Sequence, residues 1–287
     1  MIEFLKVLIL GIVEGVTEFL PISSTGHLIL VHQFFSLSPE NFSNAFDVII
    51  QFGAILSVVT IYFKELNPFS KEKNAEQKKS AVSLWKKVII GVMPAIVLGL
   101  LFDDLIDKYL FNPISVAVML VFWGIGIIIL EKKSKSVFQF NTVHDISCKT
   151  AFMIGLFQCL AMIPGTSRSA ATIIGAMILG CSRTTAAEFS FFLAIPTMLG
   201  ATMLKILKVG LHFDLFQWFL VLFGSVISYI VAILVIQKLM SYIKKHDFKV
   251  FGWYISTYLF FFSLNIISCI KNPRYCFLIQ KTVFRIF

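Results

Sequence analysis

Six apolar segments, each near the length that crosses a lipid bilayer, limit the folds open to this chain. A transmembrane helix rises ~1.5 Å per residue and needs about 20 mainly apolar residues. The segments comprise residues 46–63, 87–102, 113–130, 189–207, 216–237 and 250–270. They predict an all-α polytopic membrane protein with six transmembrane helices, because only helices and closed barrels satisfy the backbone inside a bilayer.

The composition of the 287-residue chain agrees with a membrane protein and excludes a soluble domain. Only 14% of its residues are charged and 57% are hydrophobic, whereas a soluble domain has about 25% charged residues. The formal net charge of +9 does not indicate nucleic-acid binding, because the lysines gather between the apolar segments and near the C-terminus. Five scattered cysteines show no disulfide or metal-binding spacing.

Two further apolar regions, residues 2–35 and 149–179, are each broken near the middle by proline and polar residues. The breaks read PISSTG at residues 21–26 and PGTSRS at residues 164–169. The pieces on either side are short for a crossing, and serine or threonine after proline and glycine favours the start of a new helix. Both regions are therefore predicted to be re-entrant helical hairpins that enter and leave on one side of the membrane. The glutamates in the first region also argue against a cleaved signal peptide.

The charge of the connecting loops predicts the side of the membrane on which each loop lies. Loops 64–86, 131–148 and 238–249 are rich in lysine, whereas loop 103–112 is acidic. With two re-entrant hairpins and six crossings, the basic loops fall on one side, which the positive-inside rule makes cytoplasmic. The first hairpin and both termini are then expected outside.

Each hairpin is followed by three crossings, so the second half of the chain is expected to be inverted relative to the first. Aligning Ser24 with Ser167 also aligns the prolines of the two breaks. We predict a first repeat over residues 1–130, a second, inverted repeat over residues 131–270, and an unmatched basic tail over residues 271–287. In inverted-topology repeats the broken helices meet near the membrane midplane.

The first break carries polar residues that are unusual in an apolar segment. Glu14 and Glu18 lie four residues apart, on one helical face, among valine, phenylalanine and leucine. They repel each other unless a cation lies between them or one is protonated, and their hard oxygens favour Mg²⁺ or Ca²⁺. If a helix follows the break, Ser24 and His27 share a face. All four are candidate catalytic residues, and the two glutamates are also candidate metal ligands.

The second break supplies a positive charge and further hydroxyl groups. Arg168 is the one charged residue in "PGTSRSAATIIGAMILG", and it is also a candidate catalytic residue. The two breaks would place helix N-termini inside the membrane, where their N–H groups and an arginine can bind an anion, phosphate above all. The candidate substrate-binding residues at the two tips are Ser23, Thr25, Thr166, Ser167 and Arg168.

Five further polar residues are assigned structural roles. Glu188 is expected to pair with Arg183 at the start of a span. Four histidines are expected at interfaces or in loops: His32, His144, His212 and His246. The sequence contains no P-loop, no zinc-ligand spacing and no S-R-x5-H-x3-D motif of the other membrane lipid phosphatases.

The motifs "EGVTEFLPISSTGHL" and "PGTSRSAATIIG", followed by "AAEFSFFLAIPTMLGA", resemble the undecaprenyl-diphosphate phosphatase family of the bacitracin-resistance type. The first motif is long and specific, and the second is nearly as specific. The resemblance covers about residues 1–270 and does not extend to the tail. Ala170 stands where the family usually has glycine, a difference that touches no ionisable group.

The resemblance implies hydrolysis of undecaprenyl diphosphate, which recycles the lipid carrier of peptidoglycan and other envelope polymers. It implies a divalent cation, Mg²⁺ or Ca²⁺, and a bacterial cytoplasmic (inner) membrane with the site open to the periplasmic or external face. The expected partners are the lipid substrate and membrane lipids, and a homodimer is left open. The family's site residues carry over to Glu14, Glu18, Ser24, His27 and Arg168, with Ser23, Thr25 and Ser167 nearby.

The sequence leaves the nucleophile and one alternative function open. Ser24, activated by His27, could form a phospho-enzyme, or His27 or Glu18 could activate water directly. A polyprenyl-phosphate flippase or transporter is the alternative, because inverted repeats with broken helices are also a transporter architecture. Two carboxylates beside a phosphate site favour metal-assisted hydrolysis, since without a metal they would repel the anion.

Overall fold

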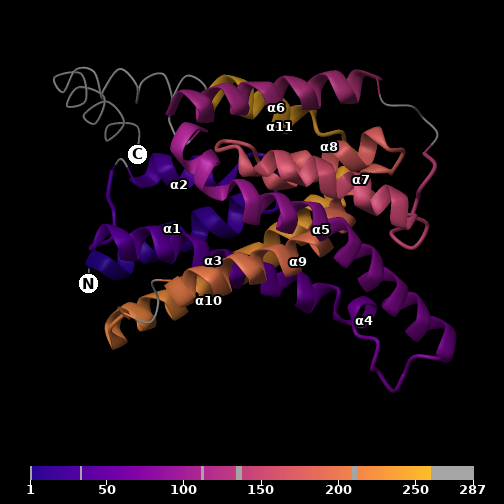
Figure 1. Cartoon of the computed structure of the whole chain (residues 1–287), viewed down its shortest axis with the longest axis horizontal. Helices are drawn as coiled ribbons and strands as arrows, with labels where there is room; N and C mark the ends of the chain where they lie inside the picture. Colours follow the sequence, from indigo (N-terminus) through magenta and orange to yellow (C-terminus); the bar gives the residue numbers. More distant parts are fainter. Residues whose placement is uncertain (1, 33, 111–112, 134–137, 209–211, 260–287) are drawn as a thin grey trace.

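The computed structural model describes residues 2–32, 34–110, 113–133, 138–208 and 212–259, and most of them are helical (Figure 1). The elements are α1 (Ile2–Thr17), α2 (Ser24–His32), α3 (Glu40–Ile61), α4 (Phe63–Leu66), α5 (Ala75–Leu110), α6 (Pro113–Lys133), α7 (Cys148–Cys159), the 3-10 turn η1 (Leu160–Met162), α8 (Arg168–Ile178), α9 (Arg183–Lys208), α10 (Leu215–Ile243), α11 (Lys249–Tyr254) and the π-helical turn η3 (Ile255–Leu259).

Five helices of the described chain are long and apolar enough to cross a membrane: α3, α5, α6, α9 and α10. These helices contain the first five of the six predicted spans, apart from residues 62 and 63 at the end of the first span. The five predictions are confirmed. Only 33–50% of each apolar window is buried, and side chains such as Ile89, Phe122 and Leu222 point outward. Apolar surface of this extent suits lipid better than water, and the protein is a multi-pass membrane protein.

The sixth predicted span, residues 250–270, falls only partly on described residues. Its first part forms α11 and η3. The rest of this span and the tail 271–287 lie outside the described residues.

Two predicted loops are largely helical, and the loop boundaries were wrong there. In loop 64–86, α5 begins at Ala75, because Asn74 and Gln77 each accept the other's backbone N–H, at 2.8 and 3.1 Å, in a capping box. Apolar length alone could not show this start, since the first turns of α5 are rich in lysine. In loop 103–112 the backbone of α5 stays helical to Leu110, because this loop contains no proline or glycine.

Both predicted hairpins are present as two helical pieces that pack on each other across a break. The pair α1 and α2 forms the first hairpin, and the pair α7 and α8 forms the second. Helices from the two halves of the sequence pack together throughout: α10 lies on α1 and α3, and α5 lies on α7 (Figure 1). Close approach of α5 and α7 depends on glycine, because a Cβ on Gly155 would overlap the carbonyl oxygen of Gly91.

The predicted pair of Glu188 and Arg183 is wrong. Arg183 instead binds Glu131 of α6, with Nη2–Oε2 at 2.5 Å and Nε–Oε1 at 2.9 Å. Glu188 interacts with Tyr62. The two residues lie five positions apart on α9, about 140° apart around the helix, so their side chains leave in different directions.

Candidate active site

The first hairpin tip is a tight turn that starts α2 at Ser24. Its backbone reverses at Ser23, which has φ of +66°, a left-handed conformation that non-glycine residues rarely adopt. Ser23 is held there by its own polar groups: its Oγ accepts the N–H of Gly26 at 3.3 Å, and its carbonyl oxygen accepts the N–H of His27 at 3.3 Å. Strained backbone of this kind concentrates at functional sites, because the surrounding fold must hold it in place.

The second hairpin tip is built by Gly165 and Ser167. Gly165 has φ of +90°, and a Cβ at this position would lie 2.5 Å from the Cα of Val116, so the turn requires glycine. Ser167 then caps α8, because its Oγ accepts the N–H of Ala170 at 3.2 Å. Arg168 is consequently the first residue of α8.

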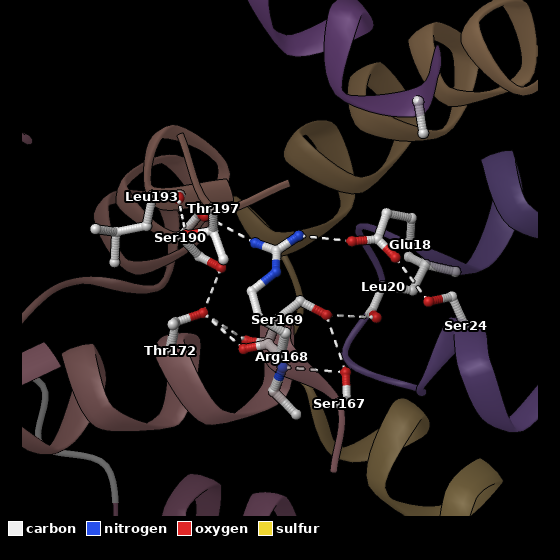
Figure 2. Close-up of polar contacts among 12 residues, drawn as sticks. Glu18, Leu20, Ser24, Ser167, Arg168, Ser169, Thr172, Ser190, Leu193 and Thr197 are labelled. Atoms are coloured by element: carbon white, nitrogen blue, oxygen red, sulfur yellow. Dashed lines mark hydrogen bonds and ion pairs between the residues drawn. The ribbon is translucent and has the colours of Figure 1, made fainter. Parts of the chain in front are cut away.

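The two tips meet through a buried ion pair (Figure 2). Arg168 Nη2 lies 2.7 Å from Glu18 Oε1, and their side chains are only 9% and 4% exposed. Arg168 Nη1 also donates to the carbonyl oxygen of Ser190 at 3.0 Å. A second contact ties the tips together, since Ser169 Oγ donates to the carbonyl oxygen of Leu20 at 2.8 Å. The tips, far apart in the sequence, therefore form one site.

Glu18 binds both the arginine and a hydroxyl. Its second oxygen, Oε2, accepts a hydrogen bond from Ser24 Oγ at 2.6 Å. The hydroxyl proton of Ser24 thus points at a carboxylate oxygen, the arrangement that a base needs in order to activate a nucleophile. Figure 2 shows Glu18 between the guanidinium of Arg168 on one side and Ser24 on the other.

A cavity of about 310 Å³ opens over this cluster. Its size is at the lower end of the range for small-molecule sites. The predicted residues that line it are Glu18, Ser23, Ser24, Thr25, Thr166, Ser167 and Arg168. Most of the predicted site is therefore brought to one place.

Two predicted site residues, Glu14 and His27, do not line this cavity. Glu14 lies one turn before Glu18, is fully buried, and neither of its carboxylate oxygens accepts a hydrogen bond from the described chain. The ring of His27 bonds away from the cavity, with Nδ1 2.8 Å from Ser23 O and Nε2 2.9 Å from Tyr254 Oη. His27 instead lines a separate, apolar cavity of about 430 Å³.

Several polar residues near the site were missed from the sequence. Gln51, Gln158 and Thr197 line the same cavity. Asp47 binds His32, with Nε2–Oδ2 at 2.7 Å, although His32 was expected merely at an interface or in a loop. The signal was present in the sequence, because Asp47 and Gln158 are isolated polar residues within apolar segments, where polar side chains are costly.

Comparison with known proteins assigns this chain to a family. The model of the family described as "Bacitracin resistance protein BacA" matches residues 7–258. The chain belongs to the BacA family. The predicted family is confirmed, and the match includes both hairpin tips and all five helices of spanning length.

Curated relatives support the same assignment over most of the chain. Undecaprenyl-diphosphatase 1 of Clostridioides difficile (strain 630) is 56% identical over 255 residues, 88% of this chain and 93% of the relative. Undecaprenyl-diphosphatase of Enterococcus faecalis is 51% identical over 257 residues, with the same coverage of 88% and 93%. That of Lachnoclostridium phytofermentans is 52% identical over 255 residues, again 88% and 93%.

Carboxylates such as those of Glu14 and Glu18 are ligands that divalent cations prefer. Among the described residues, no three His, Cys, Asp or Glu side chains are grouped closely enough to hold a metal alone. Glu14 nevertheless offers two carboxylate oxygens without a donor, beside Glu18. Mg²⁺ is commonly bound through one or two carboxylates, with water and substrate phosphate completing its shell.

Proposed function

We propose that this chain hydrolyses undecaprenyl diphosphate to undecaprenyl phosphate and inorganic phosphate, recycling the lipid carrier for cell-envelope synthesis. Its membership of the BacA family and relatives named undecaprenyl-diphosphatase support this reaction. The observation that carries the proposal is the contact of Glu18 with both Arg168 and Ser24. It unites an anion-binding arginine, a base and a hydroxyl nucleophile beside one cavity.

The second hairpin tip binds the diphosphate in this proposal. Arg168 Nε and Thr166 Oγ1 are buried donors without a partner in the described chain, and both residues line the cavity. The N-terminus of α8 adds a partial positive charge at the same point. Ser167, Ser23 and Thr25 supply further hydroxyl groups at the rim.

The first hairpin tip supplies the nucleophile and the base. Ser24 Oγ attacks the terminal phosphorus and gives its proton to Glu18, while the bond from that phosphorus to the bridging oxygen breaks. Undecaprenyl phosphate leaves with the bonding electron pair and takes the proton from Glu18, and a water molecule then hydrolyses the phosphoserine. Direct attack by water remains the competing route, with Glu18 as the base. His27 acts as a positioning residue, because its contacts with Ser23 and Tyr254 hold the tip rather than Ser24 Oγ.

A divalent cation, Mg²⁺ or Ca²⁺, completes the proposed site. Glu14 and Glu18 would hold it, with Glu18, which lines the cavity, on the side of the substrate. When bound, such an ion neutralises the charge that develops on the phosphate oxygens. Glu14 has no hydrogen-bond donor in the described chain, and a buried carboxylate without one is costly unless a cation or a proton neutralises it.

The membrane arrangement is part of the proposal. Six transmembrane helices and two re-entrant hairpins would form inverted repeats over residues 1–130 and 131–270, followed by the tail 271–287. The site would open to the periplasmic or external face of the bacterial inner membrane, since the lysine-rich segments belong on the cytoplasmic side. Surrounding lipids and a second copy of the chain are the further proposed partners.

The alternative of a polyprenyl-phosphate flippase is not favoured. The curated relatives at about half identity are named as diphosphatases. A transport site also has no need for a hydroxyl that donates to a buried carboxylate at 2.6 Å.

Phosphate release from undecaprenyl diphosphate by the purified protein in detergent tests the function, because detergent allows no vectorial transport. We expect steady release by the wild type, and at least a ~100-fold lower kcat for Glu18→Gln and for Arg168→Ala. Glu40→Gln changes an exposed side chain at the start of α3. It is the matched control and should keep wild-type activity. No release by the wild type would refute the function, and near-wild-type activity of either site variant would refute the site.

A further inference from the structure

One buried polar atom of the cavity has the wrong chemistry to bind phosphate. Three residues of the second hairpin that line the cavity each have a buried polar atom without a partner within the described ranges: Gln158 Oε1, Thr166 Oγ1 and Arg168 Nε. The last two can donate to phosphate oxygens. The Gln158 carbonyl oxygen can only accept a hydrogen bond, and an ionised phosphate oxygen offers none.

The orientation of the Gln158 amide is fixed by its neighbour on α9. Thr197 Oγ1 donates its one proton to the carbonyl oxygen of Leu193 at 2.8 Å. It can therefore only accept from Gln158, whose Nε2 lies 3.3 Å away. Turning the amide over would place two acceptors against each other, so Oε1 is the atom left without a partner.

The burial of Gln158 makes this unpaired oxygen significant. Gln158 is 2% exposed, and a buried acceptor without a donor destabilises the fold. A small donor in the cavity would remove this cost. Water is the donor that the reaction must itself bring to the site, because hydrolysis consumes one water whichever group attacks first.

We infer that Gln158 orients the hydrolytic water, with Thr197 holding the amide in place; this role rests on the site assigned under the proposed function. The water donates one proton to Gln158 Oε1 and the other toward Glu18. Its oxygen forms a bond to phosphorus. On the serine route the bond from phosphorus to Ser24 Oγ breaks at the same time, and on the direct route the bond from phosphorus to the bridging oxygen breaks. Glu18 takes one proton, the other stays on the released phosphate, and the leaving oxygen keeps the bonding electron pair. On the serine route Glu18 then returns its proton to Ser24.

Competition between water and methanol tests this role. Methanol has one hydroxyl proton, which it gives to the base, so it does not need Gln158. In Gln158→Met, which keeps the side-chain length but has no such acceptor, we expect hydrolysis to fall about 100-fold. Methyl phosphate formation should stay near the wild-type rate, so the ratio of methyl phosphate to inorganic phosphate should rise by the same factor. KM for the lipid should change by less than about twofold.

Three further variants serve as controls for this test. Gln237→Met, an exposed glutamine of α10, should leave rates and product ratio unchanged. Thr197→Val, which keeps the shape of the side chain but cannot accept from the amide, should raise the product ratio in the same direction, and Thr197→Ser should restore it. These two variants test the role even if Gln158→Met does not fold.

An equal fall of hydrolysis and methanolysis would overturn the role, since it would indicate a structural defect. So would wild-type hydrolysis by Gln158→Met, or a raised KM with unchanged kcat, which would make Gln158 a contact of the lipid head group. An unchanged product ratio in Thr197→Val would contradict the role of Thr197 in holding the Gln158 amide. Phosphate release by the wild type tests the function separately from all of these.

Discussion

At the scale of single residues, Glu18 decides the chemistry of the site. One of its oxygens contacts a guanidinium and the other a serine hydroxyl, at 2.7 and 2.6 Å. The arginine supplies a counter-charge in a place where a lone carboxylate would be costly. The same charge keeps the second oxygen able to accept the proton of Ser24. Glu14, one turn away, has neither contact.

Ser24 is expected to become phosphorylated during turnover. In a reaction with substrate labelled in the terminal phosphate and stopped with acid, the label should appear on the wild-type protein. It should be absent from Ser24→Ala, whose kcat should fall at least ~100-fold. Thr25→Ala, beside it at the same cavity, is the comparison and should still be labelled. Normal phosphate release by Ser24→Ala would leave only the direct attack of water.

Removal of divalent cations is expected to stop the reaction. Chelation by EDTA should abolish phosphate release, and added Mg²⁺ or Ca²⁺ should restore it, because two carboxylates beside a diphosphate repel it without a counter-ion. Glu14→Gln should raise the metal concentration needed for the half-maximal rate. Its effect on the free energy of unfolding should be small. Activity that is indifferent to the chelator would remove the metal from the site.

At the scale of elements, the broken helices depend on close helix contacts as well as on the breaks. The first helix of the second hairpin, α7, packs on α5. The two helices cross where Gly155 contacts the backbone of Gly91. This crossing fixes the arm that carries Gln158, one turn further along α7. Small residues let two helices approach closely in a membrane protein.

Gly155→Ala should therefore destabilise the protein, by about 1–3 kcal/mol, seen as a lower Tm in detergent. Gly200→Ala is the matched control in α9, since a Cβ there meets nothing within 4 Å. It should be neutral or stabilise by up to about 1 kcal/mol, because alanine is the better helix former. Equal Tm changes in the two variants would contradict the packing account.

At the scale of the whole molecule, one polar cluster joins α6, α9 and the residue just before α11. Glu131 of α6 is 6% exposed and binds Arg183 of α9. It also accepts the N–H of Phe248, just before α11, at 3.0 Å. Because α11 carries Tyr254 to His27, this cluster helps to place the first hairpin.

Glu131→Gln should lower the free energy of unfolding by about 1–3 kcal/mol, because it removes the charge of the carboxylate that binds the half-buried Arg183. Lys249→Met breaks the pair of Lys249 with Asp247, whose side chains are 38% and 31% exposed, and should cost at most ~1 kcal/mol. Denaturation in detergent compares the two. A cost for Glu131→Gln no larger than that for Lys249→Met would show that the cluster contributes little.

The sequence by itself determined the class of protein, five of the predicted spans and the two hairpin breaks. These follow from apolar length and from proline, glycine and serine at particular positions, which act locally. It also named the ionic residues of the tips, because a charge in an apolar segment stands out. It did not find the lysine-rich start of α5, where the capping pair rather than apolar length begins the helix.

Only the tertiary structure decided which groups touch. The contact of Glu18 with Arg168, the turn of His27 toward Tyr254, the pairing of Arg183 with Glu131 and the amide of Gln158 held by Thr197 all join distant parts of the chain. Local pattern places a residue on a helix face. Which partner that face meets depends on how the helices cross, and this is set by packing over the whole molecule.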